Sequence, residues 1–137
     1  MKVFVTGATG FIGQRLLCCL KDKGKKLKIL SRQPHPDYET LVCDLKSEVI
    51  PDGALDGVDT VFHLAGFAHD LRDPSDGEDL YRAVNVDATV RLTELASSSG
   101  IKRFVFVSSV KAGTSYEDDV GGMPEGVYGQ TKREAEL

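Results

Sequence analysis

The chain contains 137 residues, of which 41% are hydrophobic and 28% are charged, and its formal net charge is −4. This length suits one domain that buries a core, and the acidic balance argues against a protein that binds nucleic acid or an anionic membrane. No apolar run is long enough to span a bilayer and no signal peptide is recognisable, so we expect a cytoplasmic protein. Three cysteines, Cys18, Cys19 and Cys43, lack metal-ligand spacing, so we expect small buried thiols and no metal site.

The first thirteen residues predict a strand, a glycine turn and a helix in direct succession. An apolar run at 3–5 leads into Gly7, Gly10 and Gly13. A helical pattern follows, with its apolar face on Phe11, Ile12, Leu16, Leu17 and Leu20. Glycines here permit the turn, a close approach of the backbone to a diphosphate, and tight packing of helix on strand. The helix N-terminus favours an anion, so we predict a diphosphate site, although tight turns in other α/β proteins also use such glycines.

Strands and helices alternate along the rest of the chain. Further strands are predicted at 26–30, 40–43, 60–64 and 103–107, with a helix at 78–98 and a last one from Val127. The segments 66–77 and 111–125 are predicted loops. This alternation predicts an α/β fold with a doubly wound parallel sheet of order 3-2-1-4-5, and ligand at the carboxyl ends of its strands.

The last five residues stop within a helical pattern, without a capping glycine or a following proline. We therefore expect residues 1–137 to be an N-terminal dinucleotide-binding domain, cut from a longer chain. The fifth strand would then lie at a sheet edge, whose unpaired backbone groups invite a partner, so we expect a homodimer.

Tyr128 and Lys132 stand four residues apart on the last predicted helix and therefore share one face. An ammonium beside a phenol stabilises the phenolate, and such a pair can move a proton to or from an alcohol oxygen. A pair at this spacing also arises by coincidence. Ser108 and Ser109 follow the fifth strand, where a hydroxyl can hold a substrate oxygen or merely end the strand. Neither lies in a Gly-x-Ser-x-Gly elbow, which disfavours a hydrolase.

The motifs together resemble those of extended short-chain dehydrogenase/reductases, in the NAD-dependent epimerase/dehydratase family and its nucleotide-sugar branch. The matching segments, in the family's order, are 6–13 (TGATGFIG), 44–45 (DL), 63–66 (HLAG), 85–86 (NV), 104–109 (FVFVSS) and 128–132 (YGQTK). The resemblance spans the whole sequence and implies a Rossmann-type fold. Several motifs in register are far more specific than any one of them.

The resemblance also assigns roles to individual residues. Tyr128 matches the family's acid/base, Lys132 the residue that assists it and holds the nicotinamide ribose, and Ser109, in preference to Ser108, the active-site serine. His63 is expected to pack beneath its strand, and His35 and His69 to be loop residues. The cofactor contacts implied are Gly7, Thr9, Gly10, Phe11, Ile12, Gly13, Arg32, Asp44, Leu45, Leu64, Ala65, Gly66, Asn85, Val107, Tyr128 and Lys132.

The residues after the second strand bear on the choice of cofactor. An acid there would bind the ribose 2′-OH of NAD, whereas this chain has Ser31 and Arg32, and an arginine accommodates the 2′-phosphate of NADP. An arginine that stacks on adenine or faces solvent would suit either cofactor. We predict NADP slightly over NAD.

The function that the resemblance implies is hydride transfer on a nucleotide-linked sugar, by an oxidoreductase or epimerase of the 4-keto sugar reductase or 4-epimerase type. The run at 107–111 (VSSVK) resembles a bacterial subgroup that contains such reductases for polysaccharide biosynthesis. A dehydratase is disfavoured, because Asp118 and Asp119 lie too far from the serine. We expect residues 1–137 alone to be inactive, and a non-catalytic NAD(P)-binding regulatory module of the same fold is the alternative.

Overall fold

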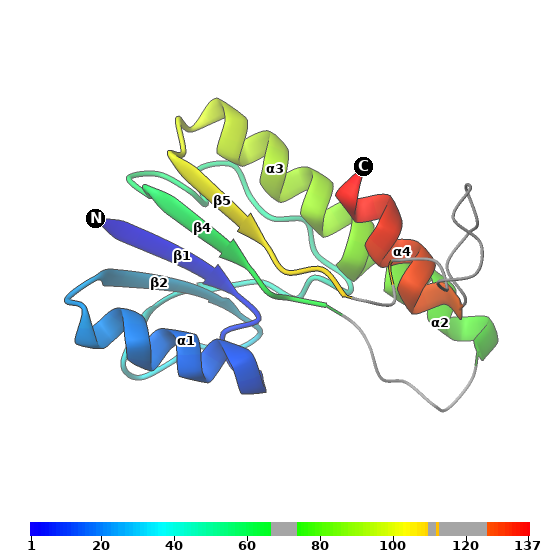
Figure 1. Ribbon diagram of the computed structural model, residues 1–137, viewed down its shortest axis with the longest axis horizontal. Coiled ribbons are helices and arrows are strands. Elements are labelled where there is room, and N and C mark those ends of the chain that lie inside the picture. The colour runs from blue at the N-terminus through cyan, green and yellow to red at the C-terminus, as the bar shows by residue number, and fades with distance from the viewer. Residues whose placement is uncertain (67–73, 110–111, 113–125) are drawn as a thin grey trace.

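The computed structural model describes residues 1–66, 74–109, 112 and 126–137, and it describes only the backbone of 74–77 and 126–127. Five parallel strands form one sheet in the order β3-β2-β1-β4-β5 (Figure 1). The strands are β1 Lys2–Thr6, β2 Lys26–Ser31, β3 Glu39–Val42, β4 Thr60–His63 and β5 Arg103–Phe106. The predicted strand order is confirmed, and each predicted strand lies within one or two residues of its observed bounds.

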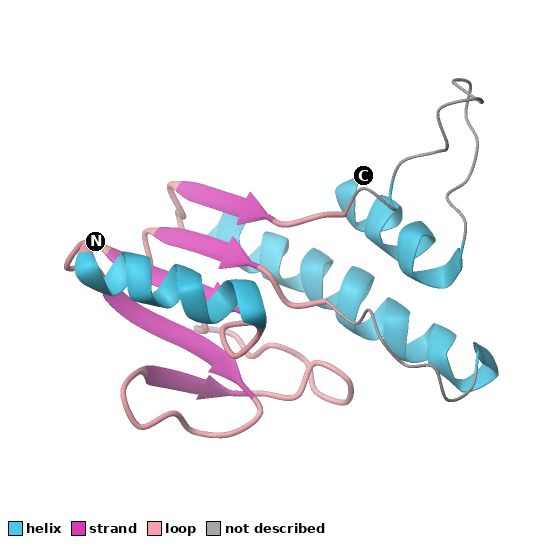
Figure 2. Ribbon diagram, turned by 60° about the horizontal axis from the view of Figure 1, so that its bottom comes forward, coloured by secondary structure: helices cyan, strands magenta, loops and turns pink. Residues whose placement is uncertain are grey.

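Helices cover both faces of the sheet (Figures 1 and 2). Helix α1, Phe11–Asp22, lies on one face. On the other face lies α3 (Ala88–Ser98), which continues without a break from α2 (Pro74–Arg82) and the π-helical segment η1 (Ala83–Asp87); α2 extends past the carboxyl ends of the strands (Figure 1). Helix α4, Gly126–Glu136, packs against α2 and η1.

The helical segment predicted at 78–98 differs from the prediction in two ways. The helix begins at Pro74, four residues before the predicted start, so part of the predicted loop at 66–77 is helical. The π-helical turn was not predicted, because a widened turn leaves the apolar spacing on either side nearly intact. The expectations for His69, Asp118, Asp119, and 110–111 lie outside the described residues, as does most of the predicted loop at 111–125.

Two apolar cores lie on the two faces of the sheet, because alternate residues of a strand point to opposite sides. The core beneath α1 contains Val3, Val5, Leu17, Leu20 and Ile29. The core beneath α3 contains Phe4, Leu30, Cys43, Ile50, Ala54, Leu55, Val58, Val61, Leu92, Leu95 and Ala96. The segment between β3 and β4 thus covers the part of the sheet that α3 does not reach.

The first helix buries a narrower face than the sequence predicted. Gly13, Leu17 and Leu20 are buried, whereas Phe11 is 74% exposed and Ile12 is 59% exposed. The first helical turn lies past the ends of the strands, where the sheet offers no apolar partner. The expectation of buried thiols is correct for Cys43 and wrong for the neighbouring pair Cys18 and Cys19, which are exposed because α1 turns them away from the sheet.

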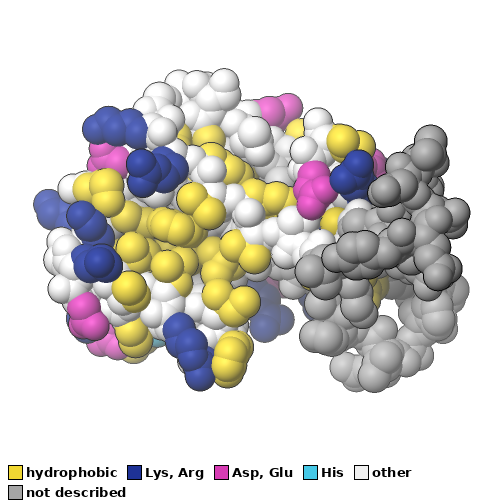
Figure 3. Space-filling model, viewed as in Figure 1, with side chains coloured by type: hydrophobic (Ala, Val, Ile, Leu, Met, Phe, Trp, Pro, Cys, Tyr) yellow, Lys and Arg dark blue, Asp and Glu magenta, His cyan; other side chains and the backbone are white. Residues whose placement is uncertain are grey.

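Apolar side chains also gather on the surface beside α1, where the sheet face at β4 and β5 is only partly covered (Figure 3). Phe62 and Val105 are partners in the register of these strands, and both are half-buried. A search of the described residues finds no helix with the length and apolar character to cross a membrane.

Candidate functional site

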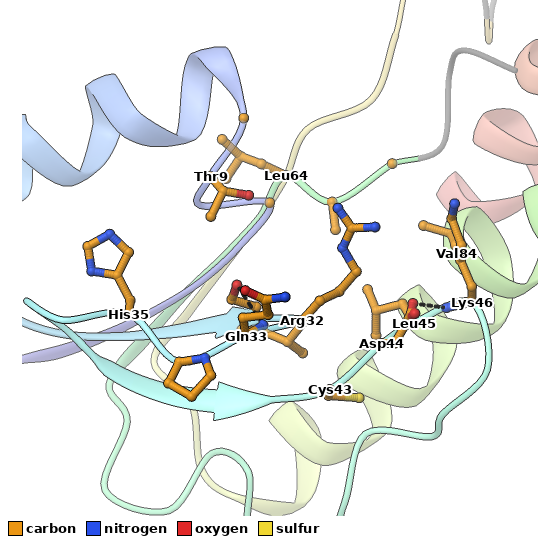
Figure 4. Close-up of a pocket in the computed structure, with 17 residues that line it drawn as sticks. Thr9, Arg32, Gln33, His35, Cys43, Asp44, Leu45, Lys46, Leu64 and Val84 are labelled. Carbon is orange, nitrogen blue, oxygen red and sulfur yellow. Dashed lines mark hydrogen bonds between the residues drawn. The ribbon is translucent and has the colours of Figure 1, made fainter.

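A cavity of about 930 Å³ opens at the carboxyl edge of the sheet (Figure 4). All five strands are parallel, so the loops that follow them meet at this edge. The cavity is lined by Gly7, Thr9, Gly10, Leu30, Ser31, Arg32, Gln33, Pro34, His35, Cys43, Asp44, Leu45, Lys46, Leu64, Ala65, Gly66 and Val84.

The turn from β1 into the start of α1, residues 7–13 and called the glycine loop below, has no room for a side chain at Gly7 or Gly13. Gly7 has φ +67°, and a Cβ on it would lie 2.7 Å from the backbone nitrogen of Ala65. A Cβ on Gly13 would lie 2.1 Å from the carbonyl oxygen of Gly7. Gly10 donates its N–H to the same carbonyl at 3.2 Å and precedes α1 without capping it through a side chain. The cavity therefore meets backbone and an open helix N-terminus, which is what a dinucleotide's diphosphate requires.

The other end of the cavity is formed by the loops after β2 and β3. Arg32 extends its side chain into the cavity (Figure 4). Asp44 accepts the backbone N–H of Lys46 at 3.0 Å through Oδ1, and the backbone N–H of Asp44 is donated to Glu48. These bonds fix the turn after β3, so Asp44 and Leu45 face the same space as Arg32.

Lys132 on α4 is buried against the opposite side of this edge, with 3% of its surface exposed. Its Nζ donates a hydrogen bond of 3.0 Å to the carbonyl oxygen of Val107, and lies 4.7 Å from the centre of the Phe106 ring. A Cβ on Gly66 would lie 3.5 Å from this ammonium. Burial lowers the pKa of Lys132, and Glu136 opposes that shift. The ammonium of Lys132 is therefore shielded from solvent, and it is held by a polar partner rather than by apolar packing alone.

Asn85 lies in η1 and is buried. Its Nδ2 donates to Thr131 Oγ1 at 3.1 Å, and Thr131 donates to the carbonyl oxygen of Tyr128 at 3.0 Å. Thr131 immediately precedes Lys132, so the π-helical segment is tied to the part of α4 that carries the predicted catalytic pair. π-helical turns occur often at functional sites.

The hydroxyl residues predicted for the site are Tyr128, Ser108 and Ser109. Tyr128 is half-buried on the first part of α4, and its ring centre is 6.5 Å from that of Tyr81. Ser108 donates its hydroxyl to Glu136, whereas the carbonyl of Ser109 accepts the N–H of Ala112 at 3.0 Å. Ser109 follows the carbonyl that binds Lys132 by two residues.

The profile of the NAD dependent epimerase/dehydratase family matches residues 3–137. The chain belongs to this family. The resemblance stated from the motifs is thereby confirmed.

Relatives in this family act on different substrates. A 3β-hydroxysteroid dehydrogenase/Δ5→4-isomerase of Mycobacterium tuberculosis is 34% identical over 88% of this chain and 35% of its own length. A UDP-glucose 4-epimerase of Vibrio cholerae is 32% identical over 98% of this chain and 45% of its own length.

Solved structures agree with the fold. MoeE5 in complex with UDP-glucose and NAD superimposes with a TM-score of 0.82 and 35% identity over 99% of this chain and 47% of that one. A UDP-N-acetylglucosamine 4-epimerase from Bacillus cereus gives 0.76 and 28% over 99% of this chain and 48% of that one. The chain thus spans about half the length of these relatives or less.

The structure brings most of the predicted cofactor contacts to one cavity, and places others beside it. Gly7, Thr9, Gly10, Arg32, Asp44, Leu45, Leu64, Ala65 and Gly66 line it, while Phe11, Ile12, Gly13, Asn85, Val107, Tyr128 and Lys132 do not. Sequence reasoning missed the lining residues Leu30, Gln33, Pro34, Cys43, Lys46 and Val84, and treated His35 as a loop residue only. Gln33, Pro34, Cys43 and Lys46 closely follow β2 or β3, and that position was the sequence signal that could have identified them.

Proposed function

We propose that the protein is an NAD(P)-dependent oxidoreductase or epimerase that transfers hydride on a nucleotide-linked sugar, of the 4-keto sugar reductase or 4-epimerase type. The observation that carries the proposal is the buried Lys132 ammonium, held by the carbonyl of Val107 beside Gly66 and four residues from Tyr128. The relatives MoeE5 and the Vibrio epimerase support the substrate class.

The cavity suits a nicotinamide dinucleotide. Gly7, Thr9 and Gly10 would hold its diphosphate, Asp44 and Leu45 its adenine end, and Ala65 and Gly66 would border the half that carries the nicotinamide. The group supplies or accepts hydride when it is bound. Phe11 and Ile12 are exposed on the first turn of α1, where they can cover the bound cofactor.

The chain's own residues would handle the proton. Tyr128 gives or takes a proton at the sugar's alcohol oxygen through Oη, and Lys132 is proposed to assist it and to hold the nicotinamide ribose. Ser109 orients the substrate oxygen. Ser108 is less suited to that task, because Glu136 accepts its hydroxyl hydrogen.

Residues 1–137 are proposed to form the dinucleotide-binding domain of the protein, with the sugar bound largely by other residues. A second copy of the chain is a proposed partner, because β5 is the last strand of the described sheet and its face with Phe62 and Val105 is partly uncovered. Light scattering at high concentration tests this, and a monomer would contradict it.

We propose NADP, in preference to NAD, as the cofactor, on the evidence of Arg32 in the cavity wall. NAD is the alternative, since MoeE5 was solved with NAD. A guanidinium bound to a 2′-phosphate should favour NADP by roughly tenfold or more in dissociation constant. Arg32→Asp should reverse that preference, and an equal preference before and after the substitution would contradict the proposal.

The decisive experiment is a screen of the full-length protein against sugar nucleotides, with nicotinamide absorbance and product analysis as readouts. Net reduction changes the absorbance, whereas epimerisation leaves it unchanged while the sugar changes. A 3β-hydroxysteroid belongs in the same screen, because the Mycobacterium relative makes a sterol alcohol the second candidate substrate. Cofactor binding without turnover of any substrate would favour a regulatory module.

Tyr128→Phe tests the proposed chemistry within that screen. We expect a loss of roughly 100-fold or more in turnover, with cofactor affinity nearly unchanged, because only the transferable proton is removed. Tyr81→Phe is the matched control, since it removes a phenolic hydroxyl from the ring that neighbours Tyr128. Unchanged turnover in Tyr128→Phe would overturn the proposed mechanism.

A further inference from the structure

His63 is the last residue of β4, and its side chain is fully buried. Its ring lies 5.7 Å from that of Phe106 and 6.3 Å from that of Phe104, centre to centre. Both ring nitrogens have partners. Nδ1 lies 2.6 Å from Thr6 Oγ1, and Nε2 lies 2.7 Å from Thr89 Oγ1. The expectation that His63 packs beneath the strand is confirmed, and the two threonines add a polar connection that the sequence did not reveal.

The partners of His63 belong to different elements of the site. Thr6 ends β1 immediately before Gly7, and its Oγ1 also accepts the N–H of Ala65 at 3.1 Å. Thr89 lies in the first turn of α3, and its hydroxyl donates to the carbonyl oxygen of Asn85 at 3.0 Å. One imidazole therefore connects the strand that enters the glycine loop with the π-helical segment.

The number of hydrogens fixes the form of the ring. Thr89 has one hydroxyl hydrogen and gives it to the carbonyl of Asn85, so its oxygen accepts the Nε2–H of His63. Nδ1 is then unprotonated and accepts the hydroxyl hydrogen of Thr6. A proton on Nδ1 would instead leave Thr6 with two donors facing its oxygen and no acceptor for its own hydrogen. Only the neutral Nε2–H form satisfies every group.

Electrostatics also favours an uncharged ring. Burial, and to a lesser extent the ammonium of Lys132, lower the pKa of His63 to about 4. The ring is thus neutral at physiological pH and its hydrogen bonds keep one direction, from Thr6 through His63 and Thr89 to the carbonyl of Asn85.

The remaining links lead to α4. Asn85 donates from its side chain to Thr131, and Thr131 donates to the carbonyl oxygen of Tyr128. Within η1 the N–H of Ala88 bonds to the carbonyl of Ala83, five residues back, so the Thr89 hydroxyl adds a side-chain bond to a widened turn. A displacement of the turn at Asn85 would move the residue that holds Thr131.

We propose that neutral His63 is a positioning residue, which fixes the π-helical segment relative to the glycine-loop strand and, through Asn85 and Thr131, the place of Tyr128 and Lys132 at the cofactor. The catalytic consequence rests on the proposed function, whereas the tautomer and the connection to the glycine loop do not. His63 moves no proton in the reaction, because both its nitrogens are occupied within the fold.

The chain offers a matched pair of variants on α3. Thr89→Val and Thr93→Val each remove one threonine hydroxyl that bonds to the carbonyl four residues back, at 3.0 Å in Thr89 and 2.7 Å in Thr93. Only Thr89 also contacts His63. In the full-length protein we expect Thr89→Val to lower kcat roughly tenfold with a cofactor dissociation constant changed by less than about twofold. Thr93→Val should leave kcat within about twofold, and Thr89→Ser should restore most of the loss.

The opposite end of the connection should affect a different quantity. Thr6→Val removes the acceptor of the Ala65 N–H and the donor to His63, beside the glycine loop. We expect it to raise the cofactor dissociation constant by roughly tenfold, a larger factor than its effect on kcat. Equal losses of kcat in Thr89→Val and Thr93→Val, or no rescue by serine, would overturn the positioning role.

A spectroscopic readout is independent of turnover. Imidazole ¹⁵N chemical shifts of the full-length protein distinguish the Nε2–H from the Nδ1–H form, and we expect the Nε2–H form for His63 at neutral pH. The Nδ1–H form or a protonated ring would overturn the proposal even in an active enzyme. Conversely, a protein that binds no nicotinamide dinucleotide but shows the Nε2–H form would contradict the proposed function and leave this connection intact.

Discussion

The glycine loop and helix α4 reach the same edge of the sheet by different means. Around the loop, position comes from backbone against backbone, as the 2.1 Å approach of a Cβ on Gly13 to the carbonyl of Gly7 shows. Around α4, position comes from side-chain hydrogen bonds, such as those of Lys132 to Val107 and Asn85 to Thr131. Backbone packing as close as that at Gly13 leaves no room for an added atom, whereas a hydrogen-bonded connection depends on every donor keeping its acceptor.

The largest effect should come from the ammonium on the α4 side. We expect Lys132→Met to lower turnover by roughly 100-fold or more, because the residue proposed to assist Tyr128 and to hold the nicotinamide ribose is lost. The free energy of unfolding should change little, since the lost bond to Val107 is offset by no longer burying an ammonium. Turnover assays and urea unfolding measure the two effects. Lys102→Met, which removes an exposed lysine paired with Asp59, is the matched control in both measurements. Full activity in Lys132→Met would mean that α4 carries no catalytic charge.

The sharpest effect on stability should come from the glycine loop. Gly13→Ala should lower the free energy of unfolding by about 3 kcal/mol, because backbone atoms on both sides would have to move. Gly10→Ala is the comparison, since its Cβ would meet only the carbonyl of Gly7 at 3.4 Å, and we expect less than about 1 kcal/mol. Denaturant titrations of both variants measure this difference in the free energy of unfolding. Equal losses in the two variants would show that close backbone packing at Gly13 does not determine the stability of the loop.

The imidazole that joins the two regions should make the protein sensitive to acid. The pKa of His63 is lowered from an ordinary 6.5 to about 4, so between these values the unfolded chain binds a proton that the native chain does not. Stability contributed by this group is therefore complete above pH 6.5 and falls as the pH drops, by about 3 kcal/mol at pH 4. His63→Gln should lack that slope in unfolding measurements from pH 7 to 4. Parallel curves for the two proteins would show that another group is responsible.

The smallest effect should come from the surface. Arg82 at the end of α2 and Glu134 on α4 form a bidentate ion pair, with guanidinium-to-carboxylate distances of 2.7 and 2.8 Å. Both side chains are nearly half exposed. We expect a double-variant cycle of Arg82→Ala and Glu134→Ala to show no coupling at high salt and unchanged cofactor affinity, since solvent and ions screen the pair. A large coupling would mean that surface charge, rather than the buried bonds, holds α4.

These regions also differ in how far the sequence could predict them. The glycine loop was predictable because the residues that specify it are neighbours in the sequence. Strand, turn and helix are consecutive, and a missing Cβ at Gly7, Gly10 and Gly13 has a meaning within the segment itself. The bonds of His63 to Thr6 and Thr89 were not predictable, because they join residues 57 and 26 positions apart and no spacing rule relates them.

The alternation of strands and helices predicted a parallel sheet covered on both faces, and the doubly wound pattern to which it conforms predicted the strand order and the edge at which the cavity opens. Tertiary structure decided which side chains are buried and where the helical geometry changes. It left Phe11, Ile12, Cys18 and Cys19 exposed, widened the helix at Asn85, and buried the charge of Lys132. Burial depends on what another segment covers, and a hydrogen bond on where a distant partner stands, so neither is encoded in the spacing of a single element.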